Sequence, residues 1–193
     1  MNKIKRNLSK YLKSLIPLLV AIITCLFLFN ENDVLLEKLN ENVTLIEKYN
    51  KFKSAGINKT IEFPENIIEK IIDTAMSFVG TPNKIGGIDK SGIDASGLVY
   101  VSIKKNSNTL FPRIAQDMAR YGLFISDSDK LKRGDLVFFH DTYEVNRIIT
   151  SVGIYLGDGE FINSSSSKGV TVSDINDPYY WKEKFFFGTR ILN

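Results

Sequence analysis

The sequence is poor in the side chains that build disulfides and metal sites. Among its 193 residues there is one cysteine, Cys25, and one histidine, His140. A single cysteine excludes a disulfide within the chain, and so few sulfur and imidazole ligands exclude the usual zinc sites. Carboxylates alone are left for a metal, and no motif groups them. We therefore expect no metal and no cofactor.

Acidic residues are absent from the first 30 positions. That stretch holds five of the 25 Lys and Arg residues, which leaves 20 basic against 22 acidic residues in the remainder, although the whole chain carries a net charge of +3. A nucleic-acid surface needs a basic excess on the folded part of a protein. We therefore expect no nucleic-acid partner.

Residues 1–30 are predicted to be a membrane anchor or a lipoprotein signal. Basic residues precede an uncharged apolar run over 14–29, and acids follow it. This charge order places the N-terminus in the cytoplasm and the remainder across the membrane. In one interpretation residues 11–29 form a membrane helix, close to the roughly 20 residues that a bilayer needs. In the other, "IITC" is a lipobox and Cys25 is the lipidated first residue. Both interpretations tether the protein outside the cytoplasm.

Residues 31–60 are predicted to form a helical spacer. Apolar residues at a three-four spacing give one stripe to a helix over 33–54, and Gly56 is placed to end it. These apolar residues are Leu36, Leu39, Val43 and Ile46. The stripe can pack on the globular part, dock on a partner or pair with a second copy. Two heptads are too few to argue for a dimer, so packing or docking is favoured.

Residues 61–193 are predicted to form one α+β domain. Helices are expected over 64–79, 96–105 and 114–122. The period then changes to β-branched and aromatic residues bounded by glycines, which is typical of strands. The expected strands are "GDLVFFH", "TSVGIYLGDGEFIN", "GVTVSDI" and "FGTRIL". Helices followed by antiparallel strands indicate an α+β architecture.

The order of these segments resembles the NlpC family of papain-like cell-wall peptidases. The segments that carry the resemblance are "FVGTP", "GG", "GIDASGLVY", "FPRIAQDMARYG", "KRGDLVFF", "SVGIYLGDGEFIN", "PYYW" and "GTRIL". None is decisive alone, but this order over residues 67–192 is specific. The resemblance implies a papain-like, NlpC-type domain in which N-terminal helices pack on an antiparallel sheet.

The resemblance also points to four altered positions. The family's cysteine nucleophile corresponds to Ala95, at a helix start where the partial positive charge favours a thiolate. The histidine base corresponds to Ser151, and the residue that orients the base corresponds to Asn163. A tyrosine that faces the family's site corresponds to Asn83. The resemblance thus predicts a catalytically inactive member, a pseudoenzyme.

Three other interpretations keep catalysis open. Ala95 would be an engineered replacement of a cysteine in an active enzyme, although Ser151 and Asn83 would then stay unexplained. A serine, either Ser96 or one within 164–167, would act with His140 as its base. A metal would be held by aspartates near glycines, although turn aspartates are ordinary. These aspartates are Asp89, Asp94 and Asp158.

For an inactive domain, the expected function lies in binding. We expect a membrane-tethered interaction or scaffold subunit of a bacterial envelope assembly, with other envelope proteins as partners. The alternative is a module that binds peptidoglycan peptides without cleaving them. The aromatic segment "YYWKEKFFF" is expected to supply core residues and an edge strand, and an exposed patch from it would favour a protein partner.

Overall fold

The computed structural model describes residues 37, 40, 43–145 and 147–191. The chain divides into two compact units, Met1–Lys48 and Tyr49–Asn193. In the first unit, residues 43–48 are helical. The predicted anchor, Cys25 included, lies outside the described residues. Within the part of the chain that is described, no helix is long and apolar enough to cross a membrane.

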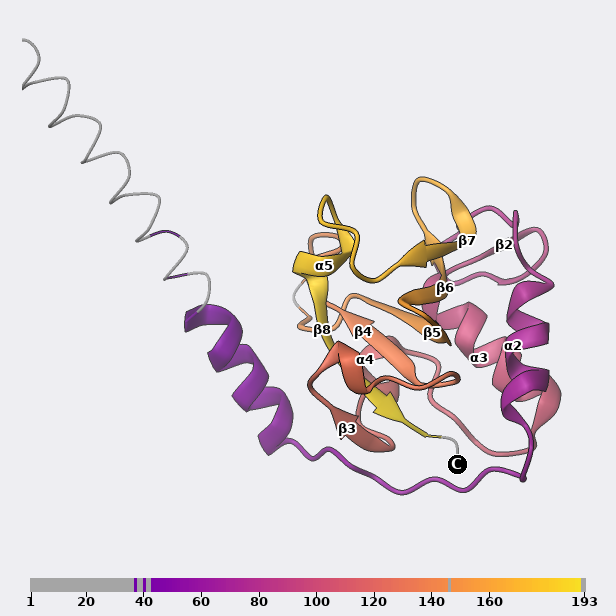
Figure 1. Ribbon diagram of the computed structural model, residues 1–193, viewed down its shortest axis with the longest axis horizontal. Helices are drawn as coiled ribbons and strands as arrows, with labels where there is room; N and C mark the ends of the chain where they lie inside the picture. The colour runs from indigo at the N-terminus through magenta and orange to yellow at the C-terminus, as the bar shows by residue number, and fades with distance from the viewer. Residues whose placement is uncertain (1–36, 38–39, 41–42, 146, 192–193) are drawn as a thin grey trace, which may run out of the picture. The chain divides into compact units, whose positions relative to one another are not determined.

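The second unit contains the helices and strands of the α+β domain (Figure 1). Its helices are α2 Ile68–Met76, α3 Ala95–Asn106, α4 Ala115–Met118 and α5 Trp181–Lys184, with a 3-10 turn, η1, over Ser128–Lys130. Its strands are β1 Ile88–Asp89, β2 Gly92–Ile93, β3 Leu123–Ile125, β4 Leu136–Phe139, β5 Ser151–Gly157, β6 Glu160–Ser165, β7 Gly169–Asp174 and β8 Phe185–Arg190.

Six strands form one antiparallel sheet in the order β3-β8-β4-β5-β6-β7, while β1 and β2 pair in a separate hairpin. The last strand, β8, lies between β3 and β4. The expectation that "YYWKEKFFF" supplies an edge strand is therefore wrong. The local residue pattern identifies a strand. The strands that lie beside it in the sheet depend on pairing between distant parts of the chain.

Side chains on the two faces of the sheet enter two apolar clusters. Helix α3 packs on one face of the sheet, and α2 packs on α3 (Figure 1). Leu98 of α3 belongs to the same apolar cluster as Val152 and Ile154 of β5. Side chains alternate along a strand, so the residues of β5 at odd-numbered positions point to the other face of the sheet. There Tyr155 packs in the cluster of Trp181. Because β5 is covered on both faces, its residues have little freedom to move.

Helix α2 begins at Ile68, four residues later than the helix expected from position 64. Asn66 has φ +57°, in the left-handed region that a right-handed helix does not allow. Ile67 is the N-cap residue and makes no side-chain cap bond. Gly80, with φ +83°, supplies the chain reversal after the helix, where the sequence predicted an end.

Residues 49–54, the start of the second unit, are helical and pack on the domain. Phe52 is buried, and its ring centroid lies 5.8 Å from that of Phe187 in β8. Arg120 donates to the carbonyls of Phe52 and Gly56, at 3.3 and 2.8 Å. Gly56, with φ +98°, follows the helix end. Residues 52–56, within the second unit, therefore contact the rest of that unit.

Candidate functional site

Ala95 is the first residue of α3, where a helix offers unpaired backbone N–H groups. Asp94 is the N-cap residue, and its Oδ1 accepts a hydrogen bond from the Gly97 N–H at 2.6 Å. Other N–H groups of a first turn have no acceptor within the helix, and the helix dipole adds partial positive charge. Ala95 is half-buried and adds only a methyl group. This position suits a carboxylate or carbonyl oxygen of a ligand.

Arg113 ties the loop before β1 to the start of α3. Its Nη2 lies 3.0 Å from Asp94 Oδ1 and donates to the Gly87 carbonyl at 3.1 Å, while its Nη1 donates to Ser96 Oγ at 2.8 Å. The second carboxylate oxygen of Asp94 accepts from the Gly86 N–H at 2.6 Å. Charge-assisted bonds of this kind are the stronger ones. The loop and the helix start therefore form one hydrogen-bonded unit.

Sequence reasoning missed Arg113. It lies 19 residues from Asp94, in the segment "FPRIAQDMARYG" between α3 and α4. The only signal was a lone arginine after a proline, and such a residue is usually exposed. The pairing of Arg113 with Asp94 depends on how that segment packs against α3. The local residue pattern does not specify this packing.

Ser151 and Asn163 lie on neighbouring strands and share one face of the sheet. Ser151 begins β5 opposite Phe139 of β4, and Asn163 lies in β6. Both side chains are buried, Asn163 completely. Side chains alternate along paired strands, and the register pairs Tyr155 with Phe161. Ser151 is four residues before Tyr155, and Asn163 is two residues after Phe161. Both side chains therefore point to the same face as Tyr155 and Phe161.

The amide of Asn163 is buried without a hydrogen-bond partner among the described residues. Most buried polar groups in proteins are paired, and leaving one unpaired costs about 1–3 kcal/mol. The resemblance places the orienting residue of the site at this position. Asn163 therefore keeps unused donor and acceptor capacity on the same face as Ser151.

Asn83 connects the loop before β1 to the sheet. Its Nδ2 donates to Ser164 Oγ at 2.9 Å, and Ser164 Oγ in turn donates to the Ile93 carbonyl at 2.7 Å. The structure thus brings Asn83 to β6, one residue from Asn163. At the position where the family carries a tyrosine, this chain has an amide that bridges the loop and the sheet.

His140 lies apart from these bonds. It follows β4, its Nδ1 lies 2.8 Å from Asp141 Oδ2, and its ring packs edge-on to Phe186. The hydroxyl of Ser96 is bound by Arg113, and that of Ser164 by Asn83. The structure does not bring His140 into hydrogen-bond contact with either serine.

The aspartates named as possible metal ligands are dispersed. Asp94 is paired with Arg113, and Asp89 accepts hydrogen bonds from Ser91. Asp158 lies at the turn between β5 and β6. Within the described ranges, no three His, Cys, Asp or Glu side chains are grouped closely enough to hold a metal ion.

Comparison with known proteins gives one matching family model, described as the NlpC/P60 family, over residues 80–190. The chain is 38% identical over 125 residues to "Probable endopeptidase NlpC" of Escherichia coli K12, covering 65% of this chain and 79% of that protein. It is 32% identical over 128 residues to "Murein DD-endopeptidase MepS/Murein LD-carboxypeptidase" of the same strain, covering 66% and 65%. The family predicted from the sequence is confirmed.

Solved structures agree on the fold. An NlpC/P60 family protein from Bacillus cereus ATCC 10987 has a TM-score of 0.59 and 27% identity, covering 68% of this chain and 42% of that one. RipD from Mycobacterium tuberculosis has a TM-score of 0.52 and 22% identity, covering 67% and 100%. Its description reads "a non-catalytic NlpC/p60 domain protein, adaptation to peptidoglycan-binding function". The predicted α+β, NlpC-type fold is confirmed.

One prediction from the sequence is wrong. The chain was expected not to be an enzyme, because Ala95 and Ser151 occupy the nucleophile and base positions. Relatives that are 38% and 32% identical carry the names of endopeptidases, and the matching family is one of enzymes. Two side chains do not decide the class of the whole protein, and the family match rests on residues 80–190 together. The roles assigned to the four site positions stay predictions.

Proposed function

Because this chain belongs to the NlpC/P60 family, we propose that it works at the bacterial cell wall and binds the peptide part of peptidoglycan at the start of α3. The observation that carries the proposal is the backbone at Ala95, where the helix start is half-buried and is fixed by the pair of Asp94 and Arg113. Unpaired N–H groups there suit the carboxylate and carbonyl groups of a peptide. The names of the relatives support this substrate class, since one includes murein.

Several features support binding at this position. The methyl group of Ala95 occupies little space, so a ligand's backbone can approach the helix closely. The loop is held by Asn83 on one side and Arg113 on the other, so little ordering is needed on binding. The description of RipD as peptidoglycan-binding offers a precedent on the same fold.

The proposed location is the outer side of a membrane. The charge order around residues 14–29 supports an anchor, either as a helix over 11–29 or through a lipid on Cys25. The relatives' names also support work outside the cytoplasm. The mass of the mature N-terminus distinguishes the two anchors, because cleavage before Cys25 removes 24 residues and lipidation adds acyl chains.

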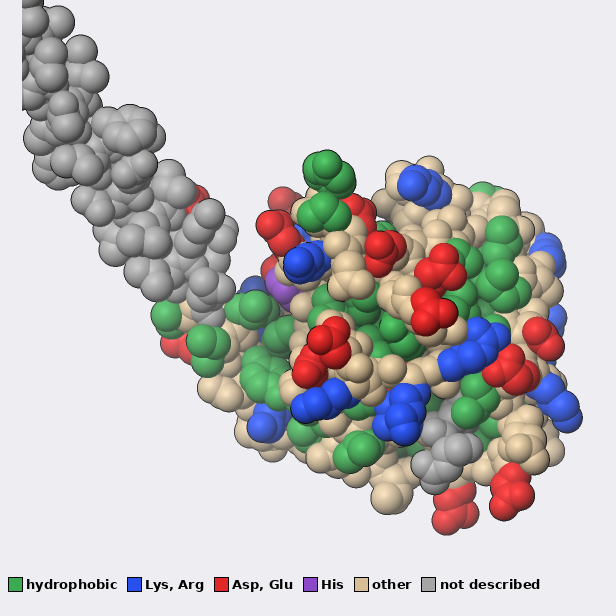
Figure 2. All heavy atoms as spheres, viewed as in Figure 1, with side chains coloured by type: hydrophobic (Ala, Val, Ile, Leu, Met, Phe, Trp, Pro, Cys, Tyr) green, Lys and Arg blue, Asp and Glu red, His purple; other side chains and the backbone are tan. Residues whose placement is uncertain are grey.

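A second candidate function is docking on another envelope protein. Tyr179 is 94% exposed and Tyr143 is 55% exposed. Tyr180 joins their two loops, because its hydroxyl donates to the Thr142 carbonyl at 3.3 Å. Figure 2 shows apolar side chains protruding beside α5 among charged ones. Exposed aromatic residues of this kind are enriched at protein interfaces.

The peptide proposal is tested by filling the space at residue 95. The full chain, in mild detergent, is titrated with a soluble tetrapeptide stem of peptidoglycan, and release of free amines is followed in the same samples. Ala95→Phe should weaken peptide binding at least about tenfold, because a bulky side chain covers the helix start. Lys105→Phe, at the other end of α3, is the matched control and should bind as the wild type does.

Equal affinity of Ala95→Phe and the wild type would refute this peptide site, as would a lack of binding by the wild type. The variant Tyr179→Ser distinguishes docking on a protein from peptide binding. If docking on a protein is the main role, mild cross-linking in membranes should recover protein partners with the wild type and not with this variant. The variant should still bind the peptide.

A further inference from the structure

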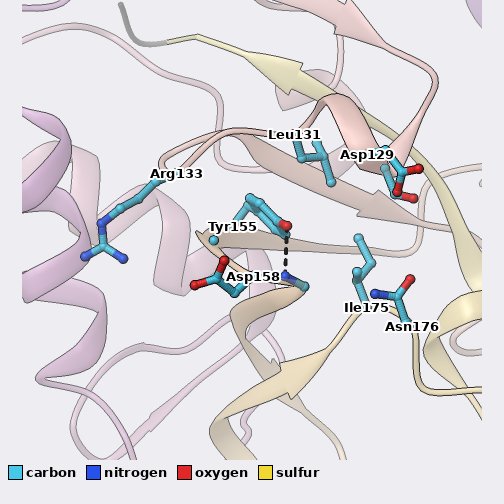
Figure 3. Close-up of a pocket in the computed structure, with 10 residues that line it drawn as sticks. Asp129, Leu131, Arg133, Tyr155, Asp158, Ile175 and Asn176 are labelled. Carbon is cyan, nitrogen blue, oxygen red and sulfur yellow. Dashed lines mark hydrogen bonds between the residues drawn. The ribbon is translucent and has the colours of Figure 1, made fainter.

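A cavity lies at the Gly157 end of β5, away from Ser151. Its volume is about 490 Å³, within the range of small-ligand sites. It lies between η1, the turn that joins β5 to β6, and the loop after β7 (Figure 3). The lining residues that matter for a ligand are Asp129, Leu131, Tyr155, Asp158, Ile175 and Asn176. None of them belongs to the candidate site at α3.

The walls of this cavity are held by hydrogen bonds within the fold. Tyr155 Oη accepts from the Gly159 N–H at 2.9 Å, which fixes the turn (Figure 3). The Ile175 N–H donates to the Gly159 carbonyl at 2.8 Å. Arg133 donates to the Leu156 carbonyl at 2.7 Å and pairs with both carboxylate oxygens of Glu69. The cavity is therefore formed before any ligand binds, and the charge of Arg133 is already neutralised.

Two carboxylates in the cavity have no such partner. The side chains of Asp129 and Asp158 make no hydrogen bond or ion pair with another described residue, although Asp127 caps η1 through the Asp129 N–H. In the view of Figure 3 they lie on opposite sides of Tyr155. Asp158 is held at φ +51°, a backbone region that few non-glycine residues adopt. Two carboxylates without a partner among the described residues therefore line the same cavity as Tyr155.

Tyr155 and Asn176 add donors to these acceptors. Tyr155 is 92% buried, with 8% exposed, and its hydroxyl serves as an acceptor for Gly159. Its own hydrogen is therefore available to a ligand. The side-chain amide of Asn176 offers both a donor and an acceptor. Leu131 and Ile175 supply apolar wall next to the Tyr155 ring. The cavity thus combines charged acceptors, neutral donors and an apolar face.

This combination distinguishes between two kinds of ligand. A primary ammonium ion would satisfy the carboxylates of Asp129 and Asp158, but it cannot accept a hydrogen bond from Tyr155 or Asn176. A pyranose sugar carries hydroxyl groups that both donate and accept, and its C–H face packs on aromatic and aliphatic side chains. We propose that this cavity is a sugar-binding site that takes one hexopyranose residue. It is separate from the peptide site and does not depend on it.

The experiment measures sugar binding to the full chain in mild detergent by ligand-observed NMR. N,N′,N″-triacetylchitotriose represents an N-acetylated wall glycan, maltotriose represents other glucose polymers, and L-lysine represents a cationic ligand. The double variant Asp129→Asn/Asp158→Asn should weaken sugar binding about tenfold, because hydrogen bonds to charged acceptors become neutral ones. Asp117→Asn, an exposed aspartate on α4, is the matched control and should leave the affinity unchanged.

Each outcome decides the proposal. Binding of chitotriose alone, weakened by the double variant, supports a site for N-acetylated glycans, and equal binding of maltotriose supports a general sugar site. Binding of lysine without either sugar overturns the proposal, as does sugar binding that the double variant leaves unchanged. Both carboxylates lie on the surface, so an unaltered melting temperature shows that the variant is folded. Ala95→Phe should not change sugar affinity, so failure of the peptide site leaves this test intact.

Discussion

The two ends of strand β5 lie in different electrostatic surroundings. Near the Ser151 end, the charged side chains at the start of α3 are paired, with Asp94 bound to Arg113 and to two backbone N–H groups. At the Gly157 end, Asp129 and Asp158 line a cavity, and neither side chain has a partner among the described residues. Paired groups stabilise a fold, and unpaired ones are available to a ligand. Substitutions at the first end should therefore change stability, and those at the second should change binding.

The largest expected effect is at the start of α3. Asp94→Ala should lower the free energy of unfolding by about 3 kcal/mol, because it removes the helix cap and leaves the partly buried Arg113 without its carboxylate. The measurement is urea unfolding of the full chain in mild detergent.

Asp117→Ala is the control for this change, because Asp117 is exposed and its side chain makes no hydrogen bond or ion pair with another described residue. Its effect should stay within about 0.5 kcal/mol. Equal losses for the two variants would show that the start of α3 is not the more strongly stabilised end.

Two glycines allow the effect of an added methyl group on stability to be compared at a crowded and at an open position. Gly169 and Gly157 have positive φ angles of +66° and +105°, so alanine is strained at both. A Cβ atom at Gly169 would lie 2.3 Å from the Thr81 carbonyl oxygen, whereas at Gly157 it would meet nothing within 4 Å. Gly169→Ala should therefore destabilise the protein by about 2 kcal/mol more than Gly157→Ala. Thermal unfolding measures the difference, and a larger loss at Gly157 would contradict it.

The pKa of an introduced thiol reports the electrostatic potential at the start of α3. In a Cys25→Ser background, Ala95→Cys places a thiol in the first turn and Lys105→Cys places one in the last. The helix dipole should lower the thiol pKa at 95 relative to that at 105, by about one unit. The rate of alkylation as a function of pH gives both values. A lower pKa at 105 would show that the carboxylate of Asp94 outweighs the helix dipole.

The smallest effect is expected at the rim of the cavity. The hydrogen bond from Arg133, with its charge, lowers the pKa of Glu69 below its ordinary value of 4.5. A lowered pKa in the folded state gives stability above about pH 4.5 that is lost as the pH falls through the folded pKa. Both side chains are well exposed, so solvent screening limits the contribution to about 0.5 kcal/mol.

Glu69→Gln should therefore reduce stability slightly at pH 7, and its difference from the wild type should shrink by pH 3. Urea unfolding at the two pH values measures this. A difference that grows toward low pH would mean that the pair does not stabilise the folded state.

Much of the domain was predictable because its elements have strong local patterns. Helix α3 and strands β4 to β8 overlap the segments expected from periodicity and from glycines, and β4, β5 and β7 lie wholly within them. The short elements were missed. Hairpin β1–β2 and strand β3 have two or three residues each, too few to show a period, and helix α5 has four. Helix α2 starts late because Asn66 adopts a left-handed conformation that the sequence did not signal.

The candidate site was located by resemblance, but its bonds were not. Ala95, Ser151, Asn163 and Asn83 are predicted positions, and their roles stay predictions, although the structure gives the burial and hydrogen bonds of these residues. Neither the link from Asn83 to Ser164 nor that from Arg113 to Asp94 was foreseen. Both join residues that are far apart in the chain, and such contacts depend on how the elements pack.

The sequence by itself determined the family of the protein. The order of its segments established the family, because local propensity and turn residues are properties of short stretches. The tertiary structure alone decided which charges are paired. Asp94 and Asp158 both adjoin turns and look alike in the sequence, yet one is bound by an arginine 19 residues away and the other lines an open cavity. A charge acquires its role from the groups that folding brings within a few ångströms, and local residue order does not specify those groups.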